Sequence, residues 1–225
     1  MTTIVLTMYL KPFYYLFLLF LSLNIFAQHK VDKTESIPYD LKVYNSPIAY
    51  KIGNNSIEIT SDGKTNLFNN PNGSIPVQNA SMILFEPDEN FTLSAKVSGQ
   101  LKEVYDVAAL VIYQDKNTWA KLCYEYSVKK RPTIVSVVTR TYSDDCNSEE
   151  TGEYAYLSVV KKGNEFSFFY STNEKDWTMV RSFHLETKNP VKVGFASHGS
   201  RGKGSTAKFS EIKYRGEALS DMRTL

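Results

Sequence analysis

The sequence predicts an all-β protein built as a sandwich or a barrel. Short segments of alternating apolar and polar residues recur along the chain, and clusters of turn-forming residues separate them. No amphipathic helix of any length interrupts these segments, and no repeat of fixed period is visible, which disfavours a propeller. Tyr and Phe, which favour strands, occur 15 and 13 times. A chain of 225 residues is long enough for one domain with a substantial core and a leader segment.

The N-terminal segment has the features of a secretory signal peptide. Lys11 precedes a short apolar run that ends at Ala27, and no cysteine directly follows to carry a lipid anchor. A membrane anchor is the alternative, but the apolar run from Phe13 to Leu23 is too short to span a bilayer comfortably. We therefore expect residues 1–27 to be a signal peptide, and the mature protein to be secreted or periplasmic without membrane association.

The remaining sequence divides into three parts. Residues 28–37 are polar and without pattern, which predicts a flexible lead-in. Residues 38–216 carry the strand signals and are predicted to form one domain, and residues 217–225 are a C-terminal tail.

Strand signals follow one another at short spacing. The first centres on Ile57 and Ile59, which alternate with polar residues, and residues 69–73 (NNPNG) are a strong turn signal. Trp177 opens a later strand after a turn, and we expect it to pack over the preceding hairpin rather than contact a ligand. The other predicted strands are, in chain order, 81–85, 91–97, three strands within 104–141, 154–161, 165–171, 191–198 and 207–214.

The middle strand of the segment 104–141 has one polar face. Trp119, Lys121, Cys123 and Glu125 alternate with more apolar residues that are predicted to face the core. An antiparallel sheet that buries one side offers the other to solvent or to a ligand. One interpretation of the polar face is a sugar site, in which Trp119 stacks on a ring and Lys121 and Glu125 bind hydroxyl groups. The alternative is a solvent-exposed salt bridge between Lys121 and Glu125, with Trp119 as a core or edge residue.

The following strand contributes partners to this face, and the length of the turn decides which. An even number of turn residues places Ser136 and Arg140 on the face of Trp119. An odd number replaces them by Thr139 and its neighbours.

Several kinds of site are disfavoured by the sequence. The three histidines are far apart and neither cysteine lies in a Cys-x-x-Cys pair, so no zinc site is predicted. The acidic segment 143–150 lacks the glycine and the terminal acid of a calcium loop, so we interpret it as a solvated turn, with calcium at Asp144 and Asp145 as the alternative. No cofactor is predicted. The net charge of +2, with a basic cluster only at residues 129–131, predicts no nucleic-acid partner.

Hydrolytic motifs are also missing from the sequence. There is no Gly-x-Ser-x-Gly elbow, and His198 with the two residues after it is interpreted as a turn that follows a strand. The two Glu-x-Asp sequences, at Glu86 and Glu174, both lack the third acid of the Glu-x-Asp-x-x-Glu pattern of β-sandwich glucanases.

Two cysteines in an exported chain predict a disulfide. A bond between Cys123 and Cys146 requires residues 142–150 to fold back as a loop over the face that carries Trp119 and Lys121. The alternative is two free thiols, with Cys123 as a small apolar filler.

Taken together, several segments resemble a known family. They are VYDVAALVIYQDKNTWAKLCYEY, TIVSVVT, FFYSTNEKDW, VKVGFASHG, TNLFNNPNGS and NASMILFEPDENFTLSAKV. Over residues 39–215 the chain resembles domain-of-unknown-function family 1349, the regulation-of-enolase-like branch of the concanavalin A-like lectin/glucanase superfamily. Val107 and Ala109 depart from the Gln and Gly of the family's Tyr-Asp-Gln-Ala-Gly motif, which leaves Tyr105 and Asp106 as its polar side chains.

The resemblance implies a concanavalin A-like jelly-roll sandwich of two antiparallel sheets, with any ligand on the concave face of the curved sheet. It implies no established activity. Analogy at the level of the fold raises the expectation of a carbohydrate ligand and nothing more specific.

We therefore expect a non-catalytic protein that binds a glycan or oligosaccharide. The residues expected to contact the ligand are Asp106, Trp119, Lys121, Glu125, Ser136 and Arg140. One alternative is a hydrolase or isomerase that acts on oligosaccharides and uses Glu125 and Asp106 as an acid pair. Another is a structural domain with no small ligand.

Overall fold

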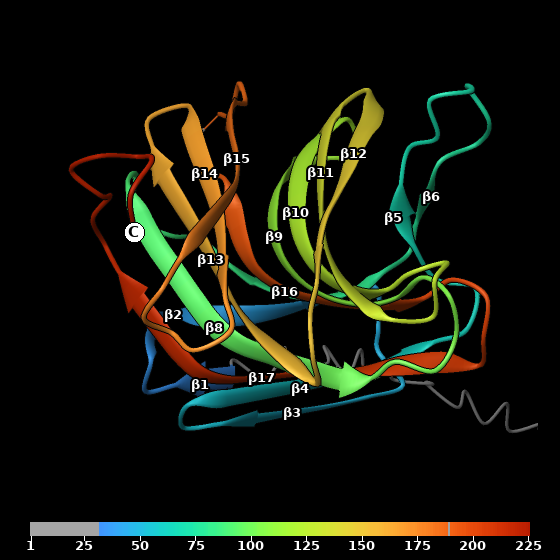
Figure 1. Ribbon diagram of the computed structural model, residues 1–225. Coiled ribbons are helices and arrows are strands. Elements are labelled where there is room, and N and C mark those ends of the chain that lie inside the picture. The colour runs from blue at the N-terminus through green and yellow to red at the C-terminus, as the bar shows by residue number, and fades with distance from the viewer. Residues whose placement is uncertain (1–31, 189) are drawn as a thin grey trace, which may run out of the picture. The chain divides into compact units, whose positions relative to one another are not determined.

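A computed structural model describes residues 32–188 and 190–225 (Figure 1). The expected signal peptide and the first residues of the lead-in lie outside this part of the chain. The described residues form two large antiparallel sheets and one two-stranded sheet. These sheets confirm the predicted β-sandwich, and no helix that could cross a membrane occurs among the described residues.

The first sheet has eight strands in the spatial order β1-β2-β7-β16-β9-β10-β11-β12. Their bounds are Asp32–Thr34 (β1), Ile37–Tyr44 (β2), Ser81–Phe85 (β7), Lys192–Gly199 (β16), Asp106–Asp115 (β9), Thr118–Tyr126 (β10), Pro132–Arg140 (β11) and Tyr142–Glu150 (β12). The second sheet has seven strands in the order β15-β14-β13-β8-β17-β4-β3. Their bounds are Thr178–His184 (β15), Glu165–Ser171 (β14), Tyr154–Lys162 (β13), Phe91–Gln100 (β8), Gly204–Arg215 (β17), Ser56–Asp62 (β4) and Ala49–Gly53 (β3).

The main hydrophobic core fills the space between the two sheets. Alternation along each strand sends every second side chain inward, such as Leu110 and Phe195 from the first sheet and Phe209 from the second. The rings of Phe195 and Phe209 meet with their centroids 4.9 Å apart. Each side chain of this size contributes about 1.5–3 kcal/mol when it leaves water, so this layer is the main source of stability.

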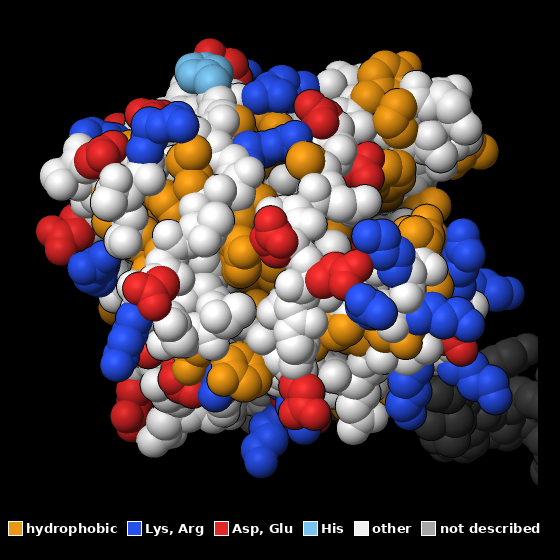
Figure 2. All heavy atoms as spheres, viewed as in Figure 1, with side chains coloured by type: hydrophobic (Ala, Val, Ile, Leu, Met, Phe, Trp, Pro, Cys, Tyr) orange, Lys and Arg blue, Asp and Glu red, His pale blue; other side chains and the backbone are white. Residues whose placement is uncertain are grey.

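The outer face of the first sheet is buried as well, where the sequence predicted a face open to solvent or ligand. A short hairpin of Leu67–Phe68 (β5) and Val77–Gln78 (β6) packs on it in a second apolar cluster that includes Trp119. Figure 1 shows β9, β10 and β11 curved, with their concave side toward β5 and β6. The tip of the hairpin leaves Ile75 90% exposed, and an apolar patch is visible there at the upper right of Figure 2.

Asn69 holds this hairpin against the sheet. Its backbone N–H donates to Ser143 Oγ at 2.9 Å, and its side-chain amide donates to the carbonyl oxygens of Lys116 (3.0 Å) and Thr141 (2.9 Å). Its side-chain oxygen accepts a hydrogen bond from Gln78 at 2.6 Å. The asparagine cluster predicted as a turn therefore also supplies the residue that fastens the cover to the sheet.

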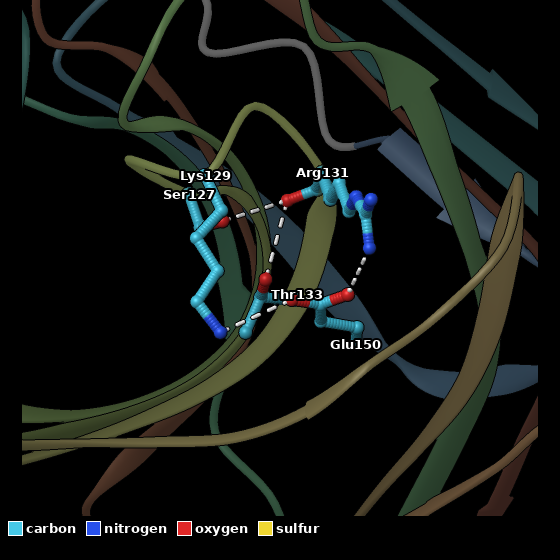
Figure 3. Close-up of polar contacts among 5 residues, drawn as sticks. All are labelled: Ser127, Lys129, Arg131, Thr133 and Glu150. Atoms are coloured by element: carbon cyan, nitrogen blue, oxygen red, sulfur yellow. Dashed lines mark hydrogen bonds and ion pairs between the residues drawn. The ribbon is translucent and has the colours of Figure 1, made fainter.

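The turn between β10 and β11 contains an odd number of residues, from Ser127 to Arg131. Both the backbone N–H and the hydroxyl of Ser127 donate to the Arg131 carbonyl at 3.0 Å, as Figure 3 shows in part. Lys129 and Arg131 both bind the carboxylate of Glu150, at 3.2 and 3.0 Å. The basic cluster thus closes a turn onto the neighbouring strand.

This turn sets the register of the polar face. Trp119 pairs with Thr139, and Leu122 pairs with Ser136. Because directly paired residues share a face, Ser136 and Arg140 point to the side opposite Trp119. The even-turn expectation is wrong, and the odd-turn alternative holds.

The acidic segment 142–150 is a strand, β12, where the sequence predicted a solvated turn or a folded-back loop. Its few apolar residues gave no strand signal, but it pairs with β11 along the sheet edge. Asp144 in this strand pairs with Arg181 at 3.3 Å. The described residues contain no group of three His, Cys, Asp or Glu side chains suited to a metal ion.

The two ends of the domain are more ordered than the predicted boundaries suggest. Strand β1 pairs with β2, so pairing begins inside the expected flexible lead-in. In the C-terminal tail, Met222 packs against Val160 and Phe169 on the outer face of the second sheet. Trp177 is partly buried against the same cluster, as the prediction that it packs over the hairpin requires.

The predicted disulfide between Cys123 and Cys146 is wrong, because the two side chains lie on opposite faces of the sheet. Cys123 pairs with Val135, whereas Cys146 pairs with Ser136, the next residue along β11. Both cysteines are free, with Cys123 buried and Cys146 exposed. Burial raises the pKa of the Cys123 thiol to about 12, so it is an inert apolar filler.

We expect one cysteine to react in the native protein and two after unfolding. Alkylation at neutral pH without reductant, followed by mass measurement of the intact protein, should add one label natively and two in denaturant. A Cys146→Ser variant should take no label in its native state. Failure of the denatured, unreduced protein to take any label would show that the disulfide exists.

Candidate functional site

A cavity of about 290 Å³ lies on the concave face of the first sheet, beside hairpin β5–β6. The sheet supplies its ionisable side chains, which are Lys121, Glu125, Asp145 and His198. The segment around the hairpin supplies two amides and one aromatic ring, which are Asn66, Asn70 and Phe68. Tyr105, from the loop between β8 and β9, and the apolar pair Val135 and Val137 complete the lining.

Strand register explains why these groups meet. Val107 lies between His198 and Glu125 in one cross-strand row, and Val137 lies between Lys121 and Asp145 in another. The row between these two carries small side chains, including Ala196, Ala109 and Cys123. Small residues in this middle row leave space above the sheet that the longer polar side chains on both sides can reach.

Lys121 and His198 form a buried polar pair across that space. Lys121 is 3% exposed and His198 is 2% exposed, and Lys121 Nζ lies 3.1 Å from His198 Nε2. Burial lowers the pKa of His198 well below its ordinary value, and the neighbouring Lys121 charge lowers it further. The imidazole is therefore neutral, with Nε2 accepting from the ammonium, and it carries its proton on Nδ1.

Glu125 is a carboxyl group held in an unfavourable place for a negative charge. Its pKa is raised to about 7, mainly by burial; the positive charge of Lys121 opposes the shift, and the negative charge of Asp145 adds to it. Lys121 and Glu125 form no ion pair in the part of the chain that the structure describes, so the predicted surface salt bridge is not present. Near neutral pH Glu125 is thus able either to donate or to accept a hydrogen bond.

The loop that carries Tyr105 is held by Asp106. The Asp106 carboxylate is fully buried and accepts the backbone N–H groups of Lys102 and Glu103, both at 2.9 Å. Tyr105 has a left-handed φ of 70°, and the guanidinium of Arg201 lies 4.8 Å from its ring centroid. Backbone strain of this kind needs support from its surroundings, and the Asp106 carboxylate supplies it.

Of the six residues expected to contact the ligand, the cavity contains Lys121 and Glu125. Asp106 precedes Val107, the partner of Glu125, and therefore points to the opposite face, so the expected acid pair does not form. Trp119 lies on the predicted face but is fully buried, and it cannot serve as an open stacking platform.

The remaining two expected contacts lie outside the cavity. Ser136 is buried on the other side of the sheet, and its hydroxyl has no hydrogen-bond partner in the described part of the chain. Arg140 is exposed and donates to the His184 carbonyl.

Sequence reasoning missed several lining residues. His198 was interpreted as part of a turn, but it is the seventh residue of the eight in β16 and faces the cavity on the concave side. Phe68 and Asn70 lie in a segment that was interpreted only through its turn residues. The alternation of 191–198 carried a signal for His198, since Ala196 and His198 share a face.

Comparison with known proteins places the chain in a family. Residues 43–217 match the family described as "Protein of unknown function (DUF1349)". The chain belongs to this family. The match confirms the resemblance inferred from the sequence segments, and a search of curated proteins finds no significant match.

Solved structures share the architecture. A functionally unknown protein from Saccharomyces cerevisiae has a TM-score of 0.74 and 21% identity, with 80% of this chain and 97% of that chain covered. The GH43 BlXynB protein from Bacillus licheniformis has a TM-score of 0.60 and 17% identity, covering 76% of this chain and 35% of that one. The carbohydrate binding module CBM66 from Bacillus subtilis has a TM-score of 0.50 and 12% identity, with coverages of 78% and 94%. At these identities the similarity shows a shared fold.

We expect Glu125→Gln to stabilise the protein increasingly as pH rises from 5 to 8. A carboxyl group with a pKa near 4.5 when unfolded and about 7 when folded binds more protons in the folded state, so its contribution to stability falls across this window. His198 has the opposite effect on stability. Its pKa is lower in the folded protein than in the unfolded chain, so stability rises as the pH increases up to the ordinary histidine pKa.

The variant retains His198, so the difference in Tm between variant and wild type isolates the carboxyl group. That difference should be small at pH 5 and should grow toward pH 8, with an upper limit of about 3 kcal/mol in unfolding free energy. A difference independent of pH would show that Glu125 titrates normally.

Proposed function

We propose that this chain is a secreted or periplasmic carbohydrate-binding protein whose glycan ligand occupies the cavity on the concave face. The observation that supports this proposal most strongly is the cavity itself, in which charged, amide and aromatic side chains lie over a floor of small residues. Its volume is close to the lower end of the range for ligand sites and suits a short sugar segment.

The chemistry of the lining supports a hydroxyl-rich ligand. Lys121 donates, Glu125 donates or accepts according to its protonation, and Asn66 and Asn70 do both. Phe68 and Tyr105 offer apolar ring faces on which a sugar can stack. A site built in this way recognises a neutral polyol through many hydrogen bonds rather than through one strong charge pair.

Relatives of the same fold support this class of ligand. One solved neighbour is a carbohydrate binding module, another is the GH43 BlXynB protein, and a third is a xylan β-1,4-xylosidase from Bacillus halodurans. The chain spans a little over a third of the length of the last two proteins. A binding role for the sandwich therefore fits better than the activity of the whole enzyme.

A catalytic role is the second candidate, and one observation favours it. Glu125 and Asp145 line the same cavity, and a carboxyl group with a pKa of about 7 is suited to act as a general acid. Turnover of an oligosaccharide that disappears in Glu125→Gln while binding persists would favour this candidate over simple binding.

The test is a glycan array followed by calorimetric titration of the best ligand. We expect Lys121→Met to weaken binding by about tenfold or more, because it removes a charged donor while it keeps the length of the side chain. Lys51→Met, at an exposed position on β3 of the second sheet, is the matched control and should bind like wild type. Folded wild-type protein that binds no glycan, or equal affinities for the two variants, would reject the proposal and favour a structural domain.

A further inference from the structure

A second hollow lies on the outer face of the second sheet, which is the sheet that does not carry the cavity described above. It has a volume of about 310 Å³ and lies beside the connection between β14 and β15 and beside the C-terminal residue. Figure 1 shows β8, β13 and β17, which form its floor, running side by side. None of its lining residues belongs to the cavity of the first sheet.

Hydroxyl groups form the floor of this hollow. Ser94 on β8 lies between Ser158 on β13 and Lys213 on β17 in one cross-strand row, and Thr92 pairs with Arg215 in the adjoining row. The Ser158 hydroxyl is fully buried and has no hydrogen-bond partner among the residues that the structure describes. Buried polar groups are nearly always satisfied, so this hydroxyl is an unused binding group at the bottom of the hollow.

The walls combine an aromatic ring with positive charge. Trp177 is partly buried and packs on the cluster around Phe169, and it also lines the hollow. Lys213 is paired with Glu174. Arg215 forms no ion pair in the described part of the chain. Glu174 and Leu225 also line the hollow, and Arg215 is its one basic side chain outside any described ion pair, beside the hydroxyl floor and the indole.

We propose that this hollow is a second ligand site, which binds an anionic sugar unit. The Arg215 guanidinium binds a carboxylate or sulfate group through paired hydrogen bonds. The part of the Trp177 indole that lines the hollow receives the apolar face of the sugar ring, so Trp177 has a binding role in addition to the packing role expected from the sequence. The hydroxyls of Ser94 and Ser158 bind ring hydroxyl groups. Both sites contain carboxyl groups, Glu125 and Asp145 in the first and Glu174 in the second. In the second site Glu174 is paired with Lys213, whereas Arg215 has no ion-pair partner among the described residues.

The two sites face outward from different sheets of the sandwich. One short oligosaccharide therefore cannot fill both, and the protein is able to hold two chains or two segments of one polysaccharide. The second site stands on its own observations and does not depend on the ligand proposed for the cavity.

The experiment is a calorimetric and fluorescence titration of the full chain with trigalacturonate. Two comparison ligands are titrated in parallel, the neutral methyl ester of trigalacturonate and a sulfated trisaccharide. We expect an anionic sugar to bind at least about tenfold more tightly than the neutral ester, and Arg215→Gln to remove this advantage. Binding should change tryptophan fluorescence, and Trp177→Phe should abolish the change, because the other tryptophan, Trp119, is fully buried.

Two control variants separate this site from its alternatives. Lys208→Gln removes one positive charge from β17 outside the hollow and should leave affinity unchanged. Lys121→Met alters only the first cavity and should also leave it unchanged. Binding of the carboxylated or the sulfated sugar with this pattern of variants supports the proposal and identifies the anion.

Three results would overturn the proposal. They are no binding of either anionic sugar by the folded protein, equal weakening by Arg215→Gln and Lys208→Gln, and loss of binding in Lys121→Met with Arg215→Gln unaffected. The second would indicate general charge attraction, and the third would place the anionic sugar in the first cavity.

Discussion

The pairing register of β9, β10, β11 and β16 is the constraint on which the candidate site depends. Side chains on a strand alternate with a period of two, so a slip of one residue would exchange Lys121 and Glu125 for core residues such as Leu122. The register between β10 and β11 is set at the five-residue turn that begins at Ser127. Two hydrogen bonds from Ser127 to the Arg131 carbonyl close this turn, and the turn's basic side chains bind Glu150 on β12. The turn between β10 and β11 thus decides which side chains of β11 lie on the same face as Lys121 and Glu125.

The cover over the concave face explains the electrostatics of the cavity. Hairpin β5–β6 removes this face from water, and burial penalises charge on His198 and Glu125. The buried ammonium group of Lys121 is stabilised because the neutral imidazole of His198 accepts a hydrogen bond from it. Polar groups that are shielded from water and only partly satisfied by one another are available to a ligand that brings its own hydroxyl groups.

The sandwich covers both of its outer faces, although by different segments. The hairpin covers the first sheet, and Met222 with its neighbours in the C-terminal tail covers part of the second. Each cover ends before the sheet does, and a hollow lies beside each of them. The same architecture therefore produces two sites of different character, one around the buried pair of Lys121 and His198 and one with a guanidinium outside any described ion pair.

By itself, the sequence determined the fold class, most strand positions and the shared face of Lys121 and Glu125, because these depend on local alternation and on turn residues. Tertiary structure decided what lies opposite that face. Nothing local distinguishes Trp119 under a hairpin from Trp119 in solvent, and the acidic strand β12 forms only because β11 offers it an edge. The separation of Cys123 from Cys146 and of Asp106 from Glu125 likewise depends on register, which long-range pairing determines and a single strand does not reveal.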